Sequence, residues 1–73
     1  MKAYEALRDA LEREGVTAYQ LAQTLGRSRY YVSNIILRKT DPKVSTLAQT
    51  LDSLGYDLVA RSREDGFEFD IDS

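Results

Sequence analysis

The sequence contains no cysteine and no histidine. Without them the chain has no disulfides, no thiolate chemistry, no imidazole general base and no ordinary zinc site. An enzyme built from this chain would depend on Asp/Glu pairs, Lys or Tyr, and no paired carboxylates fall on an evident concave site. We therefore expect a protein that is not an enzyme and that uses neither a cofactor nor a metal.

Long hydrophobic runs are also missing. The longest uninterrupted apolar stretch is two or three residues, far too short to span a membrane, and the N-terminus lacks the layout of a signal peptide. We expect a soluble, intracellular protein. At 73 residues it has room for one small domain. Domains of this size gain stability from disulfides, a metal or a partner subunit, and oligomerisation is the option that remains.

Charge is distributed unevenly along the chain. The net charge of −2 taken alone argues against a nucleic-acid partner, because duplex binding depends on Lys and Arg. However, residues 17–43 carry five basic side chains and one acidic one, whereas residues 64–73 carry five acids. Such asymmetry is typical of a nucleic-acid surface beside an acidic tail. The alternative is that these charges solvate two faces and bind nothing.

Apolar periodicity predicts four helices. The first runs from Ala3 to Glu14 and ends at Gly15. A capping box formed by Thr17 and Gln20 begins the second, which runs to Leu25 before Gly26. Ser28 is predicted to cap the third helix, which extends to about residue 37, and Ser45 to cap the fourth, which ends at Gly55.

The last eighteen residues predict a β-hairpin. Residues 56–64 and 67–71 alternate between apolar and polar, and Asp65-Gly66 between them is typical of a two-residue turn. The register that follows pairs Glu64 with Phe67, Arg63 with Glu68, Ser62 with Phe69, Arg61 with Asp70 and Ala60 with Ile71. Both arginines then face carboxylates. The alternative is a single strand followed by a frayed acidic tail.

The second and third helices carry the most specific pattern. Two helices that cross steeply through a short turn need a small residue at the crossing, a glycine in the turn and apolar residues facing inward. Ala22 is the small residue, Gly26 is the turn glycine, and the inward set is Leu21, Leu25, Val32 and Ile35. An all-helical bundle in which this arrangement is incidental is the alternative.

With these residues, the chain from Ala3 to Gly55 resembles the helix-turn-helix domains of the Xre family, to which lambdoid phage repressors and Cro proteins belong. The resemblance includes Asp41-Pro42 and the later pattern Leu47-Ala48-x-x-Leu51-x-x-Leu54-Gly55. One departure is Arg27, where the family usually has an apolar residue. The resemblance implies a four-helix, lambda-repressor-like DNA-binding domain over residues 1–55, in a cytoplasmic protein of prokaryotic or phage origin.

The resemblance further implies that the third helix is the recognition helix. In the major groove, Arg can bridge the guanine acceptors and Asn can pair with adenine. We expect base contacts from Ser28, Arg29, Tyr30 and Asn34. Phosphate contacts come from basic side chains, hydroxyls and helix N-termini. The candidates are Thr17, Tyr19, Arg27, Ser33, Arg38, Lys39 and Lys43. For Tyr31 we favour packing, and for Leu37 we expect either contact with a thymine methyl or packing on the following loop.

The C-terminal segment, residues 56–73, is predicted to be a dimerisation hairpin with an acidic tail. An isolated two-stranded hairpin with an apolar face is marginal in water, so it must cover the helices, pair with a second copy, or both. The predicted dimerisation residues are Leu58, Val59, Phe67, Phe69 and Ile71.

These features predict a sequence-specific regulator, a Cro-like repressor that binds an inverted-repeat operator on double-stranded DNA as a homodimer. Two alternatives stay open. One is an antitoxin that binds a toxin through the acidic C-terminal segment and autoregulates its operon. The other is an adaptor that binds a protein through the helix-turn-helix scaffold.

Overall fold

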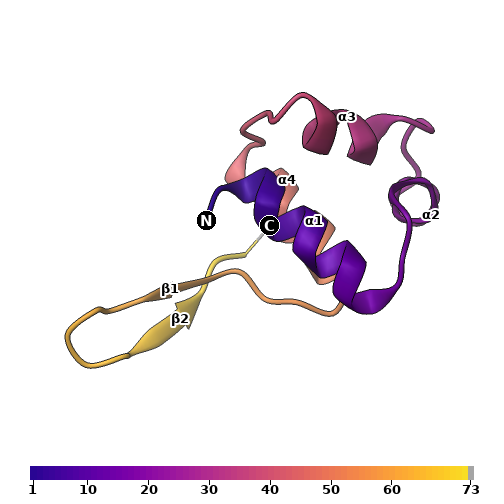
Figure 1. The fold of residues 1–73 in the computed structure, drawn as a ribbon. Coiled ribbons are helices and arrows are strands. Elements are labelled where there is room, and N and C mark those ends of the chain that lie inside the picture. The colour runs from indigo at the N-terminus through magenta and orange to yellow at the C-terminus, as the bar shows by residue number, and fades with distance from the viewer. Residues whose placement is uncertain (73) are drawn as a thin grey trace.

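The computed structural model describes residues 1–72, and Ser73, the last residue of the predicted acidic tail, lies outside them. The chain forms a small, mainly helical domain followed by a short antiparallel hairpin (Figure 1). Within the described residues the elements are α1 (Ala3–Glu14), α2 (Ala18–Thr24), α3 (Tyr31–Leu37), α4 (Val44–Asp52), β1 (Val59–Arg61) and β2 (Glu68–Asp70). The prediction of a mainly helical domain with a C-terminal hairpin is confirmed.

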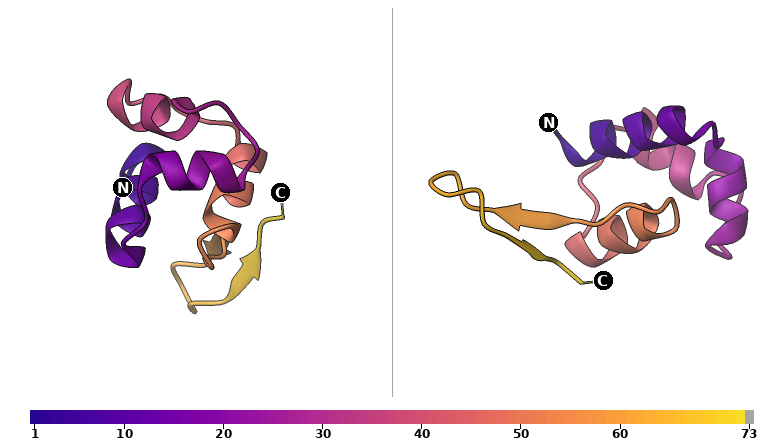
Figure 2. Two further views of the ribbon diagram at one scale, coloured as in Figure 1. Left: turned by 90° about the vertical axis from the view of Figure 1, so that its right-hand side faces the viewer. Right: turned by 90° about the horizontal axis from the view of Figure 1, so that it is seen from below.

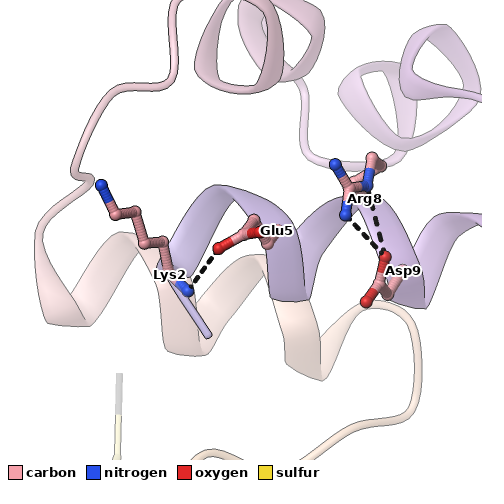
Figure 3. A network of polar contacts seen from close by, with 4 residues as sticks. All are labelled: Lys2, Glu5, Arg8 and Asp9. Carbon is pink, nitrogen blue, oxygen red and sulfur yellow. Dashed lines mark hydrogen bonds and ion pairs between the residues drawn. The ribbon is translucent and has the colours of Figure 1, made fainter.

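Helix α1 has the predicted bounds. Its first turn is closed by the Lys2 backbone N–H, which donates to Glu5 Oε1 at 2.9 Å, and Arg8 forms an ion pair with the adjacent Asp9 at 3.2 Å (Figure 3). At the other end Gly15 adopts a left-handed conformation with φ of 67°. That conformation is favourable for glycine, so the helix ends where the sequence indicates.

Helix α2 begins with the predicted capping box. Thr17 Oγ1 accepts from the Gln20 backbone N–H at 3.1 Å, and Gln20 Oε1 accepts from the Thr17 backbone N–H at 3.0 Å. Two backbone donors that the helix leaves without partners are thereby satisfied. The helix ends at Thr24, one residue earlier than predicted, and Gly26 follows with φ of 68°.

The predicted start of the third helix was wrong. Helix α3 begins at Tyr31, because residues 28–31 form a turn in which the Tyr31 N–H donates to the Ser28 carbonyl at 3.0 Å. No side-chain hydrogen bond caps the helix. As a result Ser28, Arg29 and Tyr30 lie in the turn before α3 and not on the helix itself.

The predicted cap of the fourth helix was also wrong. The backbone carbonyl of Lys43 accepts the first helical bond, from Leu47 N–H at 2.9 Å, so Lys43 is the N-cap and Ser45 lies inside the first turn. The sequence predicted Ser45 because serine is a preferred N-cap residue, whereas the lysine side chain has no hydrogen-bond acceptor. The helix ends at Asp52, earlier than predicted, and Gly55 follows after a short turn with a left-handed φ of 85°.

The core lies where α1, α2 and α3 meet. Its buried members are Leu7, Leu11, Leu21, Ala22 and Val32. Half-buried side chains from the helix ends surround it, including Leu25, Tyr31, Ile35, Ile36 and Leu54. Helix α4 contacts α1 and adds buried Ala48 and Leu51. The inward set predicted for the second and third helices is therefore buried or half-buried.

No helix within residues 1–72 is long and apolar enough to cross a membrane.

The hairpin forms, but its predicted register was wrong by two residues. Arg61 pairs with Glu68, Ala60 with Phe69, and Val59 with Asp70. The turn is a four-residue loop, closed by the Ser62 N–H donating to the Phe67 carbonyl at 2.8 Å. Within this loop Asp65 Oδ1 accepts from the Phe67 N–H at 3.1 Å, a local bond that favours the longer turn.

A shift of two residues keeps every side chain on its predicted face, because strand side chains alternate with a period of two. Arg63, however, moves into the loop and no longer faces Glu68. Neither Arg61 nor Arg63 forms an ion pair within residues 1–72, so the predicted charge pairing is not part of the hairpin.

The hairpin projects from the helical body (Figures 1 and 2). All three residues of β2 are exposed, and the described chain measures 41 Å along its longest axis against 22 and 21 Å along the others. The sequence left open that the apolar face covers the helices, pairs with a second copy, or does both. In this chain only the base of that face, at Leu58 and Ile71, is half-buried, whereas Phe67 and Phe69 stay exposed.

Candidate nucleic-acid interface

The interface begins with the way in which α2 supports α3. Ala22 and Val32 are completely buried where the two helices meet, and a residue without a long side chain at position 22 lets them approach closely. In Figure 1 α2 is seen almost along its axis while α3 runs across the view, so the two axes are far from parallel. This arrangement leaves one side of α3 open to solvent.

Arg29, in the turn before α3, lies close to two tyrosine rings. Its Cζ atom is 5.4 Å from the ring centroid of Tyr19 on α2 and 5.9 Å from that of Tyr30. The hydroxyl of Tyr19 accepts from Gln23 Nε2 at 3.1 Å. We call Tyr19, Arg29 and Tyr30 the arginine clamp, which joins the start of α2 to the turn before α3.

The sequence pointed to Arg29, Tyr19 and Tyr30 separately and missed their association. It also missed Gln23, although the spacing of four residues from Tyr19 on one helix is the signal that would have found it.

Arg27 also lies over a tyrosine ring. Its Cζ atom lies 5.2 Å from the ring centroid of Tyr31, which is half-buried and packs against the core. The packing role predicted for Tyr31 is confirmed. An exposed guanidinium is thus held beside the start of α3.

The outward side of α3 carries Asn34, which is exposed, and Leu37, which is 78% exposed. Leu37 does not pack on the following loop, so one of its two predicted roles is wrong. Ser33 is half-buried, and its hydroxyl donates to the Tyr30 carbonyl at 3.3 Å. Because the Ser33 hydrogen is already engaged, contact with a phosphate, which only accepts, would require that bond to break.

Basic side chains continue past the end of α3. Arg38, Lys39 and Lys43 are all exposed, and Lys39 has a positive φ of 51°. Together with Arg27 and Arg29 they form what we call the basic surface. The only ion pair within residues 1–72 is Arg8 with Asp9, so none of these five cations is neutralised by a carboxylate of the described chain.

Thr17 stands at the start of α2, and its exposed hydroxyl accepts from a backbone N–H. Its own hydrogen is therefore free to donate to an anion at this helix start. All base-contact candidates and most phosphate-contact candidates therefore lie in the turn between α2 and α3, on α3, or in the loop between α3 and α4.

The hairpin carries the predicted dimerisation residues on two faces. Phe67 and Phe69 are 65% and 59% exposed, and their ring centroids lie 6.2 Å apart. Leu58 and Ile71 are half-buried and joined by a 2.7 Å backbone bond at the base of the hairpin. Val59, which pairs with Asp70, lies on the opposite face from Phe69.

A groove of about 560 Å³ opens beside the base of the hairpin. Its apolar lining comes from Met1, from Ala6 and Ala10 of α1, from Leu51 of α4, and from Leu58 and Val59 at the base of the hairpin. Tyr56, at one side, donates to Glu14 Oε2 at 2.8 Å, and this hydrogen bond raises the pKa of Tyr56 above its ordinary value of 10.0. The Arg13 guanidinium lies 5.9 Å from the Tyr56 ring.

Within residues 1–72 no three His, Cys, Asp or Glu side chains are grouped so as to hold a metal ion. Comparison of the chain with protein-family models, curated proteins and solved structures finds no match.

Proposed function

We propose that the protein is a sequence-specific transcriptional regulator, a repressor, that binds an inverted-repeat operator on double-stranded DNA as a homodimer. In this proposal the four helices are a lambda-repressor-like helix-turn-helix domain of the Xre type, and α3 is the recognition helix. The observation that carries the proposal is the basic surface, five exposed cations without carboxylate partners around the open side of α3.

The dimensions of α3 suit the major groove. An α-helix with its side chains is about 10–12 Å in diameter, which fits a groove about 12 Å wide, and α3 has one side open to solvent. Arg29 supplies the paired donors that match guanine, and Asn34 supplies the donor and acceptor that match adenine. Ser28 and Tyr30, in the same turn as Arg29, are the remaining candidates for base contacts.

Contacts to phosphate set the position of such a protein without reading sequence. Arg38, Lys39 and Lys43 follow α3 directly and would lie beside the backbone if α3 enters the groove. Thr17, with its free hydroxyl hydrogen at the start of α2, would contact the same backbone from the other side of the turn. Binding through these groups should weaken steeply with salt because cations are released from the DNA.

The projecting hairpin supports the homodimer. Both of its strands have an unpaired edge, and Phe67 and Phe69 expose apolar surface that α1 to α4 do not cover. In a two-fold antiparallel pairing, the tip of one hairpin would lie beside the base of the other, where the apolar groove opens. A second copy of the chain is thus the occupant that we propose for this surface.

An antitoxin is the second candidate function. Glu64, Asp65, Glu68, Asp70 and Asp72 are all exposed, and they give the hairpin an acidic surface suited to a basic protein. This form of the proposal expects an adjacent gene whose product arrests growth and binds the chain. Replacing Glu68 and Asp70 with Lys should abolish that binding and leave DNA binding intact, whereas unchanged binding to the toxin would contradict the antitoxin role.

The test is an NMR titration of the labelled protein with a short duplex of mixed sequence. The proposal predicts that amide shifts concentrate at residues 27–39 and at Thr17, whereas Arg8 and Asp9 on α1 stay unchanged. Arg8 is the matched control because it is an exposed cation already paired with a carboxylate. Shifts confined to the hairpin or to α1, or no shifts at all, would contradict the proposal.

A further inference from the structure

The arginine clamp holds Arg29 between two tyrosine rings. Neither a solvated cation nor an isolated base contact would require those rings. Arg29 lies in the turn before α3, so no helical backbone restricts its side chain. Its Cζ atom nevertheless lies 5.4 and 5.9 Å from the centroids of two aromatic rings. One ring comes from α2 and the other from the residue beside Arg29, so the clamp depends on the packing of α2 against α3.

A cation–π contact restrains a guanidinium without consuming its hydrogen-bond donors. The attraction is between the cation and the face of the aromatic ring, whereas the N–H donors lie in the guanidinium plane. Within residues 1–72 Arg29 has no ion-pair partner and no side-chain hydrogen bond. The donors therefore stay available to a ligand while the side chain is held in place.

Tyr19 is itself held in position. Its hydroxyl oxygen accepts from Gln23 Nε2 at 3.1 Å, one helical turn further along α2. The hydroxyl hydrogen remains free to donate to a phosphate. A single tyrosine thus offers two separable contributions, a ring that restrains Arg29 and a hydroxyl that can contact the DNA backbone.

We infer that Tyr19 and Tyr30 are positioning residues that hold Arg29 ready to read one guanine in each operator half-site. This inference rests on the proposed function. It gives Tyr19 a part in sequence recognition although the residue lies on α2, outside the recognition helix. It also gives the ring of Tyr30 a supporting role beside any base contact of its own.

The experiment selects duplexes from a random library with the wild-type protein and with five variants, and compares base preferences position by position. Arg29→Ala identifies the guanine that Arg29 reads. Tyr19→Leu removes one ring of the clamp, and Tyr30→Leu removes the other, so the test does not depend on the folding of one variant. Arg8→Ala is the control, because it removes an exposed cation that pairs with Asp9 on α1 and lies outside the basic surface.

We expect Tyr19→Leu and Tyr30→Leu each to lower the guanine preference at that one position by roughly 2- to 5-fold, the size of one exposed cation–π contact. Tyr19→Leu should leave the preferences at all other positions unchanged, and Tyr30→Leu should change at most the one further position that Tyr30 itself contacts. Arg8→Ala should leave every preference unchanged. Tyr19→Phe should keep the guanine preference and weaken binding to all sequences alike, because it keeps the ring and loses the hydroxyl.

If the wild-type protein selects an operator and Tyr19→Leu and Tyr30→Leu keep the full guanine preference, the inference is overturned and the proposed function stands. Equal loss of preference at every position would also overturn it, since a disturbed fold would have that effect. If the wild-type protein selects no sequence, the proposed function fails and the inference fails with it.

Discussion

Lys39 combines an unfavourable backbone with a useful charge. Helices α1, α2 and α4 are followed by left-handed glycines, whereas α3 is followed by Lys39 with φ of 51°, the only positive φ of a non-glycine residue within residues 1–72. A side chain in this conformation costs about 1–2 kcal/mol. Glycine would remove that cost. In the proposed function, the charge of Lys39 at the end of α3 is what favours lysine at this position.

Lys39→Gly is therefore predicted to stabilise the protein and weaken DNA binding. The gain should be roughly 0.5–1 kcal/mol in the free energy of unfolding, since the entropy cost of glycine offsets part of the relieved strain. Chemical denaturation measures it, and a salt titration of binding should show a slope smaller by about one charge.

Arg38→Gly is the matched control for Lys39→Gly. Arg38 has a right-handed conformation with φ of −86°, so glycine there relieves no strain and should lower stability. Equal stability changes in the two variants would contradict the account of Lys39.

Asp65 makes the hairpin loop sensitive to acid. The backbone N–H of Phe67, followed by the Ser62 hydroxyl, holds the pKa of Asp65 below its ordinary value of 3.8. The ionised carboxylate is thus favoured in the folded loop, and this contribution is complete above 3.8 and is lost as the pH falls through the lowered folded-state pKa.

An NMR titration of the Phe67 amide checks this prediction. The amide shift should change with a midpoint below 3.8, and Asp65→Asn should abolish the transition while its side-chain carbonyl keeps the loop bond. A midpoint at or above 3.8 would show that the loop bond does not favour the carboxylate.

Among the elements, the contact between α2 and α3 decides whether the basic surface exists. Ala22 is completely buried there, and the extra atoms of a larger side chain would separate the two helices. Ala22→Leu should lower the free energy of unfolding by about 1–3 kcal/mol, as overpacking of a close contact does.

Thermal or chemical denaturation measures the effect of Ala22→Leu, and Thr24→Leu on the exposed side of α2 is its control. The control should change stability by less than about 0.5 kcal/mol. If both variants unfold alike, position 22 is not a close crossing of the two helices.

The elements also show which local signals could be read from the sequence. The Thr17–Gln20 capping box and the glycines that follow the first, second and fourth helices, at 15, 26 and 55, were predicted because each needs only residues close in the chain. The starts of α3 and α4 were not, because Ser28 and Ser45 are good caps that the backbone does not use. There, the turn at 28–31 and the extended backbone of Lys43 decide the start.

The candidate site was predicted as a set of positions but not as a set of contacts. The basic residues and Asn34 follow from composition and helical spacing. The arginine clamp depends on how the turn before α3 folds back toward Tyr19, which no sequence pattern encodes. Similarly, the hairpin and its faces were predicted, but its register was not, because the Asp65–Phe67 bond lengthens the turn.

At the scale of the whole molecule, the two charged regions are separate. The basic surface lies around α3, whereas five of the twelve acidic side chains, at positions 64, 65, 68, 70 and 72, lie on a hairpin that projects from the helical body (Figure 2). The net charge of −2 hides this separation. A dimer joined through the hairpins would keep the acids at its centre and away from the phosphates that α3 approaches.

The double variant Phe67→Ser, Phe69→Ser tests this arrangement. Both side chains are more than half exposed in the single chain, so removing them should leave the helices folded and shift the protein to monomers in sedimentation equilibrium. Val44→Ser, which removes an exposed apolar residue of α4, should leave the oligomeric state unchanged. A wild-type protein that is monomeric at tens of micromolar would contradict the proposed dimer.

The most direct test of the central claim is selection of duplexes from a random library by the wild-type protein at near-physiological salt. The account predicts enrichment of an inverted repeat whose half-site centres lie about one helical turn, roughly 10 bp, apart, because a symmetric dimer presents two copies of α3. Weak binding that disappears as salt rises, with no enriched sequence, would show that only counterion release is at work and would contradict the account.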